Sequence, residues 1–149
     1  MAQESVEIVR AMYEVANAGG KLGANFDVLA PDVEFHVSGA FPDLDQVYRG
    51  HEGVRKLNDA LNEPWAALSL DPYEFIDAGS RVLVLSRFRA RGRDGMELRL
   101  DLANLWTVRD GKIVRMEAFS DHESALEAIG ANTTPSGGLP RRGRRRLVT

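Results

Sequence analysis

The chain has 149 residues, of which 44% are hydrophobic and 28% are charged, and it contains no cysteine. This length and composition are typical of one globular domain with a buried core. The absence of cysteine excludes a disulfide framework, a thiolate metal site and a cysteine nucleophile. We find neither a signal peptide nor a stretch approaching the roughly 20 apolar residues of a membrane span, so we expect a cytoplasmic protein without membrane contact.

Charge is distributed unevenly along the chain. The net charge is −3, but the last nine residues, RRGRRRLVT, include five arginines and no acidic residue. The rest of the chain has 14 basic against 22 acidic residues, near −8, and a net-acidic body is a poor ligand for nucleic acid. We therefore expect a folded domain over 1–130 and a disordered Gly/Pro/Arg-rich tail over 131–149. Whether this tail is simply solvated or contacts an acidic partner is left open.

Helices are predicted from apolar residues at helical spacing and from capping residues. Ser120 with Glu123 fits a capping box, after which Leu126 and Ile129 would dock the last helix on the sheet. The first predicted helix covers 5–17 and is ended by a Gly-Gly pair, and a short second helix covers 25–29. A third helix covers 52–61 and is ended by Pro64, and the last helix begins at 120.

Strands are predicted from residues that alternate between two faces. In the strand over 33–37, Glu34 and His36 share one face, opposite the apolar residues. Pro72 makes the strand over 68–77 an edge strand or a bulged one. Strands over 81–91 and 98–108 follow, and Asp110-Gly111 predicts a tight hairpin to a last strand, because both central residues of a type I′ turn need positive φ.

Asn104 is the most informative residue of the penultimate strand. It is the one polar residue on a face that it shares with Leu98, Leu100, Leu102, Trp106 and Val108. A carboxamide among large apolar side chains needs a hydrogen-bond partner, and it therefore marks a pocket or a structural lock.

Several segments together resemble the nuclear transport factor 2-like superfamily and, within it, the SnoaL-like branch. They are IVRAMYEVANAGG, LAPDVEFHV, YRGHEGVRKL, IDAGSRVLVL and LWTVRDGKIVRMEAFSDHESALEA. The resemblance implies an α+β fold in which a curved mixed or antiparallel sheet wraps around three to four helices into a cone. It also implies an enclosed apolar cavity on the concave side and, often, a homodimer through the convex side. Leu83, Leu85 and Leu105 would form the apolar patch of that interface.

Comparison with ketosteroid isomerases of this superfamily suggests two candidate catalytic residues. The general-base aspartate of those enzymes falls on His36, and an oxyanion-hole acid falls on Asn104. An imidazole side chain can give or take a proton, so His36 could serve as the acid or base, with Asn104 as a neutral donor. The alternatives are a buried, neutral His36 that is hydrogen-bonded to Asn104 or to a backbone carbonyl, and a His36 that orients a ligand.

Six further residues are candidates for ligand binding. Tyr13 lies beside the position of the isomerase tyrosine. Ser86, Phe88 and Ala118 stand about where limonene-epoxide hydrolases have their Asp-Arg-Asp set, so the resemblance disfavours that activity. The candidates other than Tyr13 and Ser86 are apolar residues expected on the inner face, which could equally be plain core: Phe88, Leu102, Trp106 and Met116.

Two functions remain open at this point. The first is a cofactor-free isomerase, cyclase or dehydratase that acts on a small hydrophobic molecule. The second is a non-catalytic small-molecule-binding or dimerisation module with the same cavity. No cofactor is expected. No metal site is expected either, because the three histidines lack ligand spacing.

Overall fold

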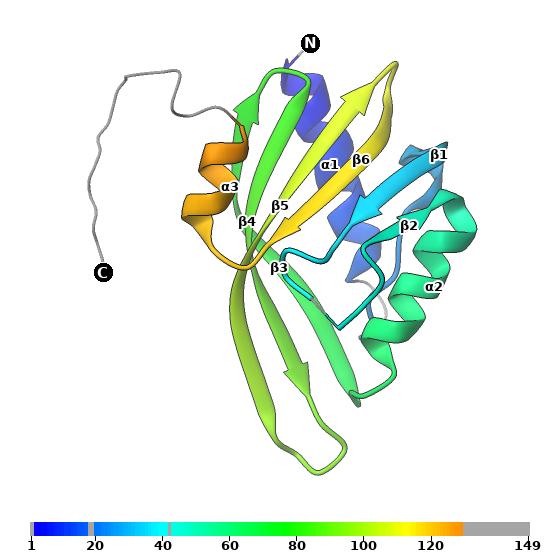
Figure 1. Ribbon diagram of the computed structural model, residues 1–149, viewed down its shortest axis with the longest axis vertical. Coiled ribbons are helices and arrows are strands. Elements are labelled where there is room, and N and C mark those ends of the chain that lie inside the picture. The colour runs from blue at the N-terminus through cyan, green and yellow to red at the C-terminus, as the bar shows by residue number, and fades with distance from the viewer. Residues whose placement is uncertain (1, 18–19, 42, 130–149) are drawn as a thin grey trace.

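The computed structural model describes residues 2–17, 20–41 and 43–129, and the side chains from residue 4 onward within these ranges. The predicted domain boundary near 130 and the tail over 131–149 lie outside the described residues. The elements, in chain order, are α1 (Ala2–Ala16), the 3-10 helix η1 (Phe26–Val28), β1 (Leu29–His36), β2 (Val47–Arg49), α2 (Gly50–Asn62), β3 (Ala67–Ala78), β4 (Arg81–Arg91), β5 (Glu97–Arg109), β6 (Lys112–Phe119) and α3 (His122–Ala128) (Figure 1).

The strands form one mixed, open sheet in the order β2-β1-β6-β5-β4-β3. Neighbouring strands are antiparallel except for β1 and β6, which are parallel. The fold is therefore the predicted α+β arrangement with a mixed sheet. Within the described part of the chain, no helix is long and apolar enough to span a bilayer.

The β5–β6 hairpin and the β3 edge follow the local sequence signals. Asp110 and Gly111 have φ values of 54° and 78°, as the predicted tight turn requires. β3 lies at one edge of the sheet, and its pairing with β4 shifts register between Pro72 and Glu74. Pro72 thus lies both on an edge strand and at a bulge, the two positions that were predicted, because neither requires the backbone N–H that proline lacks.

The main core lies between α1, α2 and the concave face of the sheet. α1 buries Met12 and the row formed by Val9, Tyr13 and Ala16, whereas Val15 from the neighbouring row is 46% exposed. α2 adds Val54 and Leu57 to the same core, at the end of the sheet formed by β1 and β2. Helices thus cover the concave face, as Figure 1 shows for α1, which lies behind the strands.

The opposite face of the sheet is covered in part by α3. Leu83, Leu85 and Leu105 are at most 9% exposed, because they form a second apolar cluster with Ala125 of α3. Figure 1 shows α3 in front of β4 and β5, on the side opposite to α1. The three leucines are therefore not an exposed patch, and the reason for predicting a homodimer through them was wrong.

The cap of α3 and one of its two predicted docking residues differ from the prediction, whereas Ile129 packs against the second cluster as predicted. Asp121, not Ser120, caps the helix, and its carboxylate accepts from the backbone N–H of Ser124 at 2.7 Å. Ala125 is fully buried, whereas Leu126 is 37% exposed. A small residue faces the sheet because the helix lies close to it, and the larger Leu126 points away.

Candidate functional site

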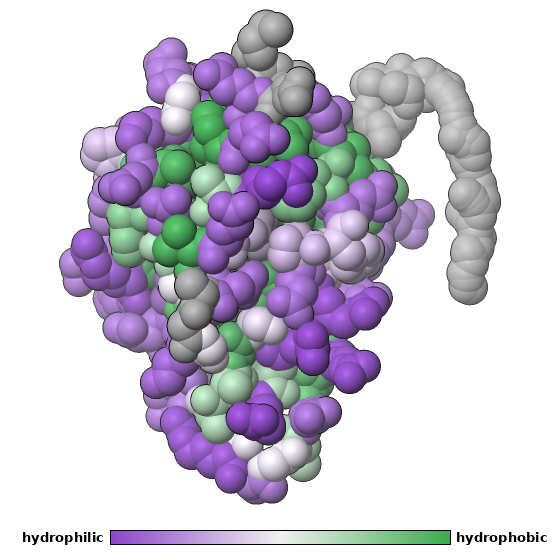
Figure 2. All heavy atoms as spheres, turned by 180° about the vertical axis from the view of Figure 1, so that it is seen from behind, coloured by the Kyte–Doolittle hydropathy of each residue, from purple (hydrophilic) through white to green (hydrophobic). Residues whose placement is uncertain are grey.

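A cavity of about 60 Å³ lies under α1, between that helix, α2 and the concave face of β4, β5 and β6. Its lining is apolar except for Tyr13, Asn58 and Asn104, together with the backbone of Gly23. Seen from the α1 side, the surface above it mixes hydrophilic areas with smaller hydrophobic ones (Figure 2). The predicted ligand-binding residues that line the cavity, besides Tyr13, are Phe88, Leu102, Trp106 and Met116.

Strand alternation and register bring the polar residues of β4 and β5 together. Leu102, Asn104 and Trp106 face the concave side of β5, since alternate residues share a face. Val84 of β4 pairs with Asn104, so Ser86 is its diagonal neighbour on the same face. Ser86 does not line the cavity but is fully buried beside it.

A buried hydrogen-bonded cluster joins α1 to these strands. The Tyr13 hydroxyl donates to Asn104 Oδ1 at 3.2 Å, and the Ser86 hydroxyl donates to the same oxygen at 3.2 Å. The indole Nε1–H of Trp106 donates to the Tyr13 oxygen at 3.0 Å. Asn104 is therefore both a structural lock between α1 and the sheet and a polar group that faces the cavity, the two roles that its sequence position indicated.

The amide nitrogen of Asn104 is less well satisfied than its oxygen. Its one acceptor among the described residues is Met116 Sδ at 3.5 Å. A thioether sulfur is a weak acceptor, and an amide nitrogen has two N–H groups to donate. Asn104 is only 4% exposed, so this donor capacity is enclosed in the protein next to the cavity.

Tyr13 is the only residue with a titratable side chain among the described residues that line the cavity. Burial raises the pKa of its phenol well above the usual value of 10.0, and the hydrogen bond from Trp106 opposes this shift only in part. Tyr13 is therefore a neutral phenol at physiological pH. It can donate a proton in a hydrogen bond, but it is no general base.

His36 lies outside the cavity, and its predicted contact with Asn104 was wrong. On β1 it is Phe35 that lines the cavity, so the neighbouring His36 points to the other face of the sheet. The imidazole Nε2 of His36 lies 2.9 Å from Glu34 Oε1. This hydrogen bond and the nearby Arg49 guanidinium lower the pKa of Glu34.

Several lining residues were not among the sequence candidates, and three of them show why. Phe35 has a clear signal, because it shares its face with Val33 and Val37 in the alternating pattern of β1. Phe41 comes from a loop, and Asn58 comes from the half-buried side of α2. In neither place does a periodic pattern tell residues that line a cavity from residues at the surface. Phe41 packs against Phe88, with ring centroids 5.6 Å apart, and helps to close the cavity.

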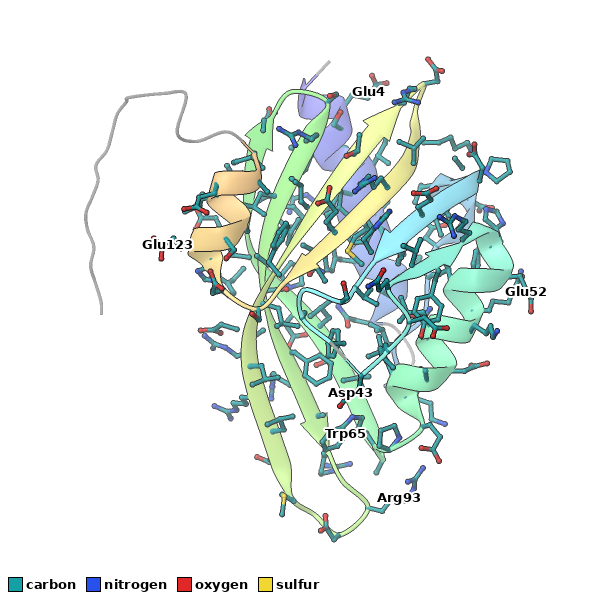
Figure 3. All side chains as sticks on the ribbon, in the orientation of Figure 1. Glu4, Asp43, Glu52, Trp65, Arg93 and Glu123 are labelled. Carbon is teal, nitrogen blue, oxygen red and sulfur yellow. The ribbon has the colours of Figure 1, made fainter. Side chains whose placement is uncertain are left out.

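Among the described residues, no acidic or basic side chain lines the cavity. Figure 3 shows the side chains of Glu52, Arg93 and Glu123 pointing outward, from α2, the β4–β5 turn and α3. Over residues 2–17, 20–41 and 43–129, no three histidine, aspartate or glutamate side chains are grouped to hold a metal ion. The polar chemistry next to the cavity is therefore that of neutral amide, hydroxyl and indole groups.

Comparisons with known proteins identify the family. No curated protein matches the chain. Among solved structures, TerC, co-crystallised with polyporic acid, is 26% identical with a TM-score of 0.69, over 85% of this chain and 98% of TerC. A protein of unknown function from Burkholderia pseudomallei K96243, described as NTF2-like, is 26% identical with a TM-score of 0.65, over 85% and 97% of the two chains. A proposed SnoaL-like polyketide cyclase from Jannaschia sp. CCS1 is 20% identical with a TM-score of 0.66, over 87% and 94%. The sequence profile of the SnoaL-like domain matches residues 9–116, and the chain therefore belongs to the SnoaL-like domain family.

Proposed function

We propose that this protein binds a small, largely apolar molecule in the cavity under α1. The observation behind the proposal is the combination of an apolar lining with one enclosed carboxamide, Asn104, beside it. Ligand sites are typically apolar cavities with a few polar groups that orient the ligand.

The comparisons support a small-molecule role. TerC, to which the chain is 26% identical, was crystallised with polyporic acid. The proposed polyketide cyclase from Jannaschia is less similar and supports the fold alone. A small-molecule ligand is consistent with both the cavity and the TerC structure.

The size of the cavity limits what can enter without rearrangement. Its volume of about 60 Å³ is far below the ~300 Å³ at the lower end of ligand pockets. A ring of five or six atoms is about the largest ligand that small side-chain shifts would admit. A larger ligand requires movement of Phe41 and Leu61, two half-buried side chains of the lining.

Binding is favoured over proton-transfer catalysis. An isomerase, cyclase or dehydratase needs a base beside the reacting carbon. His36 faces the other side of the sheet, and the neutral Tyr13 is the one titratable side chain of the described lining. The cavity thus has groups that hold a ligand in place but no group to remove its proton.

An NMR titration with benzene and cyclopentane, each a ring of the size that the cavity admits, tests the proposal. Binding should shift the resonances of Trp106 and Met116, give nuclear Overhauser effects from the probe to both side chains, and raise the melting temperature. Ala118→Leu should abolish these effects by filling the cavity, because Ala118 is part of the lining. Ala103→Leu is the matched control, because Ala103 is equally buried but belongs to the cluster under α3. Unshifted Trp106 and Met116 resonances at saturating probe would refute the proposal without any variant.

A further inference from the structure

We propose that a groove on the outer face of the sheet, on the side away from the apolar cavity, binds the phosphate group of a small phosphate monoester. The groove has a volume of about 330 Å³ and is lined by three arginines, Arg89, Arg91 and Arg99, and we call it the arginine groove. It shares no lining residue with the cavity under α1, so the inference does not rest on the function proposed for that cavity.

Strand alternation places the three arginines on the face opposite the cavity. Phe88 of β4 lines the cavity, so Arg89 and Arg91 lie on the other face, since alternate residues share a face. Leu102 of β5 also lines the cavity, and Arg99 belongs to the opposite set of residues. Figure 1 shows the β4–β5 hairpin extending past α3, so this helix does not cover the part of the outer face that includes the arginines.

The register of β4 and β5 brings like charges together. Arg89 and Arg99 are direct cross-strand partners. Side chains in this relation have Cβ atoms about 4.5–5.5 Å apart, and like charges there destabilise the sheet. Arg91, two positions from Arg89 on the same face, adds a third positive charge to the groove. An anion between the guanidinium groups would relieve this repulsion.

Two of the three charges have no counterion in the described part of the chain. Arg89 Nη1 donates to Asp71 Oδ2 at 3.3 Å, and the Ser69 hydroxyl donates to the same carboxylate oxygen at 3.3 Å. Asp71 is therefore already engaged. The side chains of Arg91 and Arg99 form no hydrogen bond or ion pair with any other described residue. The groove thus has two guanidinium groups that are available to a ligand.

Two available guanidinium groups match the charge of a phosphate monoester. Its phosphate has close to two negative charges at neutral pH and three acceptor oxygens. The planar fork of a guanidinium group donates two parallel N–H groups to phosphate oxygens, which makes arginine well suited to this anion. A carboxylate has one negative charge and would leave one of the two arginines without a counterion.

The remaining lining specifies the rest of the ligand. Glu97 is the cross-strand partner of Arg91 but forms no ion pair with it, so its carboxylate would repel a second anionic group. The organic part of the ester should therefore be uncharged. A bare phosphate ion fills roughly the space of two or three water molecules, each about 30 Å³, so most of the groove is left for this organic part.

An NMR titration of the full chain with phenyl phosphate tests the inference. At about 0.15 M NaCl, where weak surface attraction is screened, the side-chain Nε–H resonances of Arg91 and Arg99 should shift and reach saturation. The indole resonance of Trp106, next to the cavity, should not move. Inorganic phosphate should bind more weakly because it lacks the organic part, and benzoate should bind about tenfold more weakly because it has one charge.

Variants with matched charge changes locate the site. Arg91→Gln and Arg99→Gln should each weaken the binding of phenyl phosphate about tenfold, because each removes one charge-assisted contact. Arg109→Gln is the control, because Arg109 is an exposed arginine at the other end of β5 that does not line the groove. It changes the net charge equally and should leave the affinity unchanged. Glu97→Gln should strengthen binding, because it removes a carboxylate from the lining. All four side chains are exposed, so we expect the variants to fold.

Four outcomes would overturn the inference. Unshifted Arg91 and Arg99 resonances in the presence of phenyl phosphate would show that the groove does not bind the ester. Equal weakening by Arg99→Gln and Arg109→Gln would show only general attraction to a charged surface. Tighter binding of inorganic phosphate than of phenyl phosphate would assign the groove to the free ion. Unshifted resonances in a protein that sediments as a dimer would make a carboxylate of a second copy the counterion of these arginines. None of these outcomes bears on the ligand of the apolar cavity, for which benzene and cyclopentane are the probes.

Discussion

Tyr13 connects α1 to the sheet through two hydrogen bonds inside the core. Replacing it by Phe leaves the Trp106 N–H without an acceptor and removes one donor to Asn104. An enclosed donor left without a partner costs about 1–3 kcal/mol, so we expect Tyr13→Phe to lower the free energy of unfolding by this amount in urea denaturation. Tyr73→Phe is the control, because the Tyr73 side chain is half exposed. Loss of its hydroxyl should change the free energy of unfolding by less than about 0.5 kcal/mol.

The raised pKa of Tyr13 predicts a loss of stability in alkali. In the folded protein the phenol stays protonated above pH 10, whereas in the unfolded chain it ionises near 10.0. The unfolded state then binds fewer protons, so the free energy of unfolding falls as the pH rises above 10, by up to about 1.4 kcal/mol per pH unit. Below pH 10 this contribution is constant. The difference in the free energy of unfolding between the wild-type protein and Tyr13→Phe, measured from pH 8 to 11, isolates the effect. A difference that stays constant over this pH range would contradict the prediction.

Single residues also show where sequence reasoning succeeded and failed. Asn104 was recognised because an amide in an apolar row is unusual, and the structure does give it partners. His36 was misplaced because the resemblance to an enzyme family was given more weight than the alternation of β1, which already put it opposite Phe35. The contacts of Tyr13 with β5 span 91 and 93 positions, which no local pattern reveals.

At the scale of elements, the loop after β1 is held close to β6 at Gly39. A Cβ atom at this residue would collide with the carbonyl oxygen of Ala118, which is backbone and cannot rotate away. We expect Gly39→Ala to destabilise the protein by about 1–3 kcal/mol, the usual cost of overpacking. In Gly23→Ala the new Cβ would meet no atom closer than 3.9 Å, so thermal unfolding of this control should be nearly unchanged.

The docking of α3 can be tested by two neighbouring substitutions. Ala125→Asp would place a charge in the apolar cluster with Leu83 and Leu105 and should lower stability by several kcal/mol or detach the helix. Leu126→Asp should have a small effect, because Leu126 is partly exposed. The sequence-based expectation that Leu126 docks the helix predicts the reverse order, so chemical denaturation of the pair distinguishes the two.

Elements with a strong local signal were predicted well. The Asp110-Gly111 turn, the bulge at Pro72 and β4 over Arg81–Arg91 match the structure. The three-residue strand β2 was missed, because its pairing with β1 depends on a distant segment and not on its own pattern. The α3 face was misjudged because seven residues are too few for a helical period to be read reliably.

For the whole molecule, a homodimer stays a prediction. With Leu83, Leu85 and Leu105 covered by α3, a dimer through this face would have to use the charged part of β3, β4 and β5. That part has ion pairs between Arg87 and Asp101 and between Arg89 and Asp71. A dimer of this kind should weaken as salt increases, because exposed charges are screened. Sedimentation equilibrium at 50 and 500 mM NaCl checks this, and a monomer under both conditions would contradict the prediction.

The two ends of the sheet have a consequence for how the protein behaves at high concentration. One end is the three-residue β2, and the other is β3, interrupted by Pro72 and its bulge. A strand from a second chain needs a straight row of free N–H and C=O groups to pair with, and neither end provides a long one. The fold therefore resists runaway strand-by-strand polymerisation, even though it is built around one large open sheet.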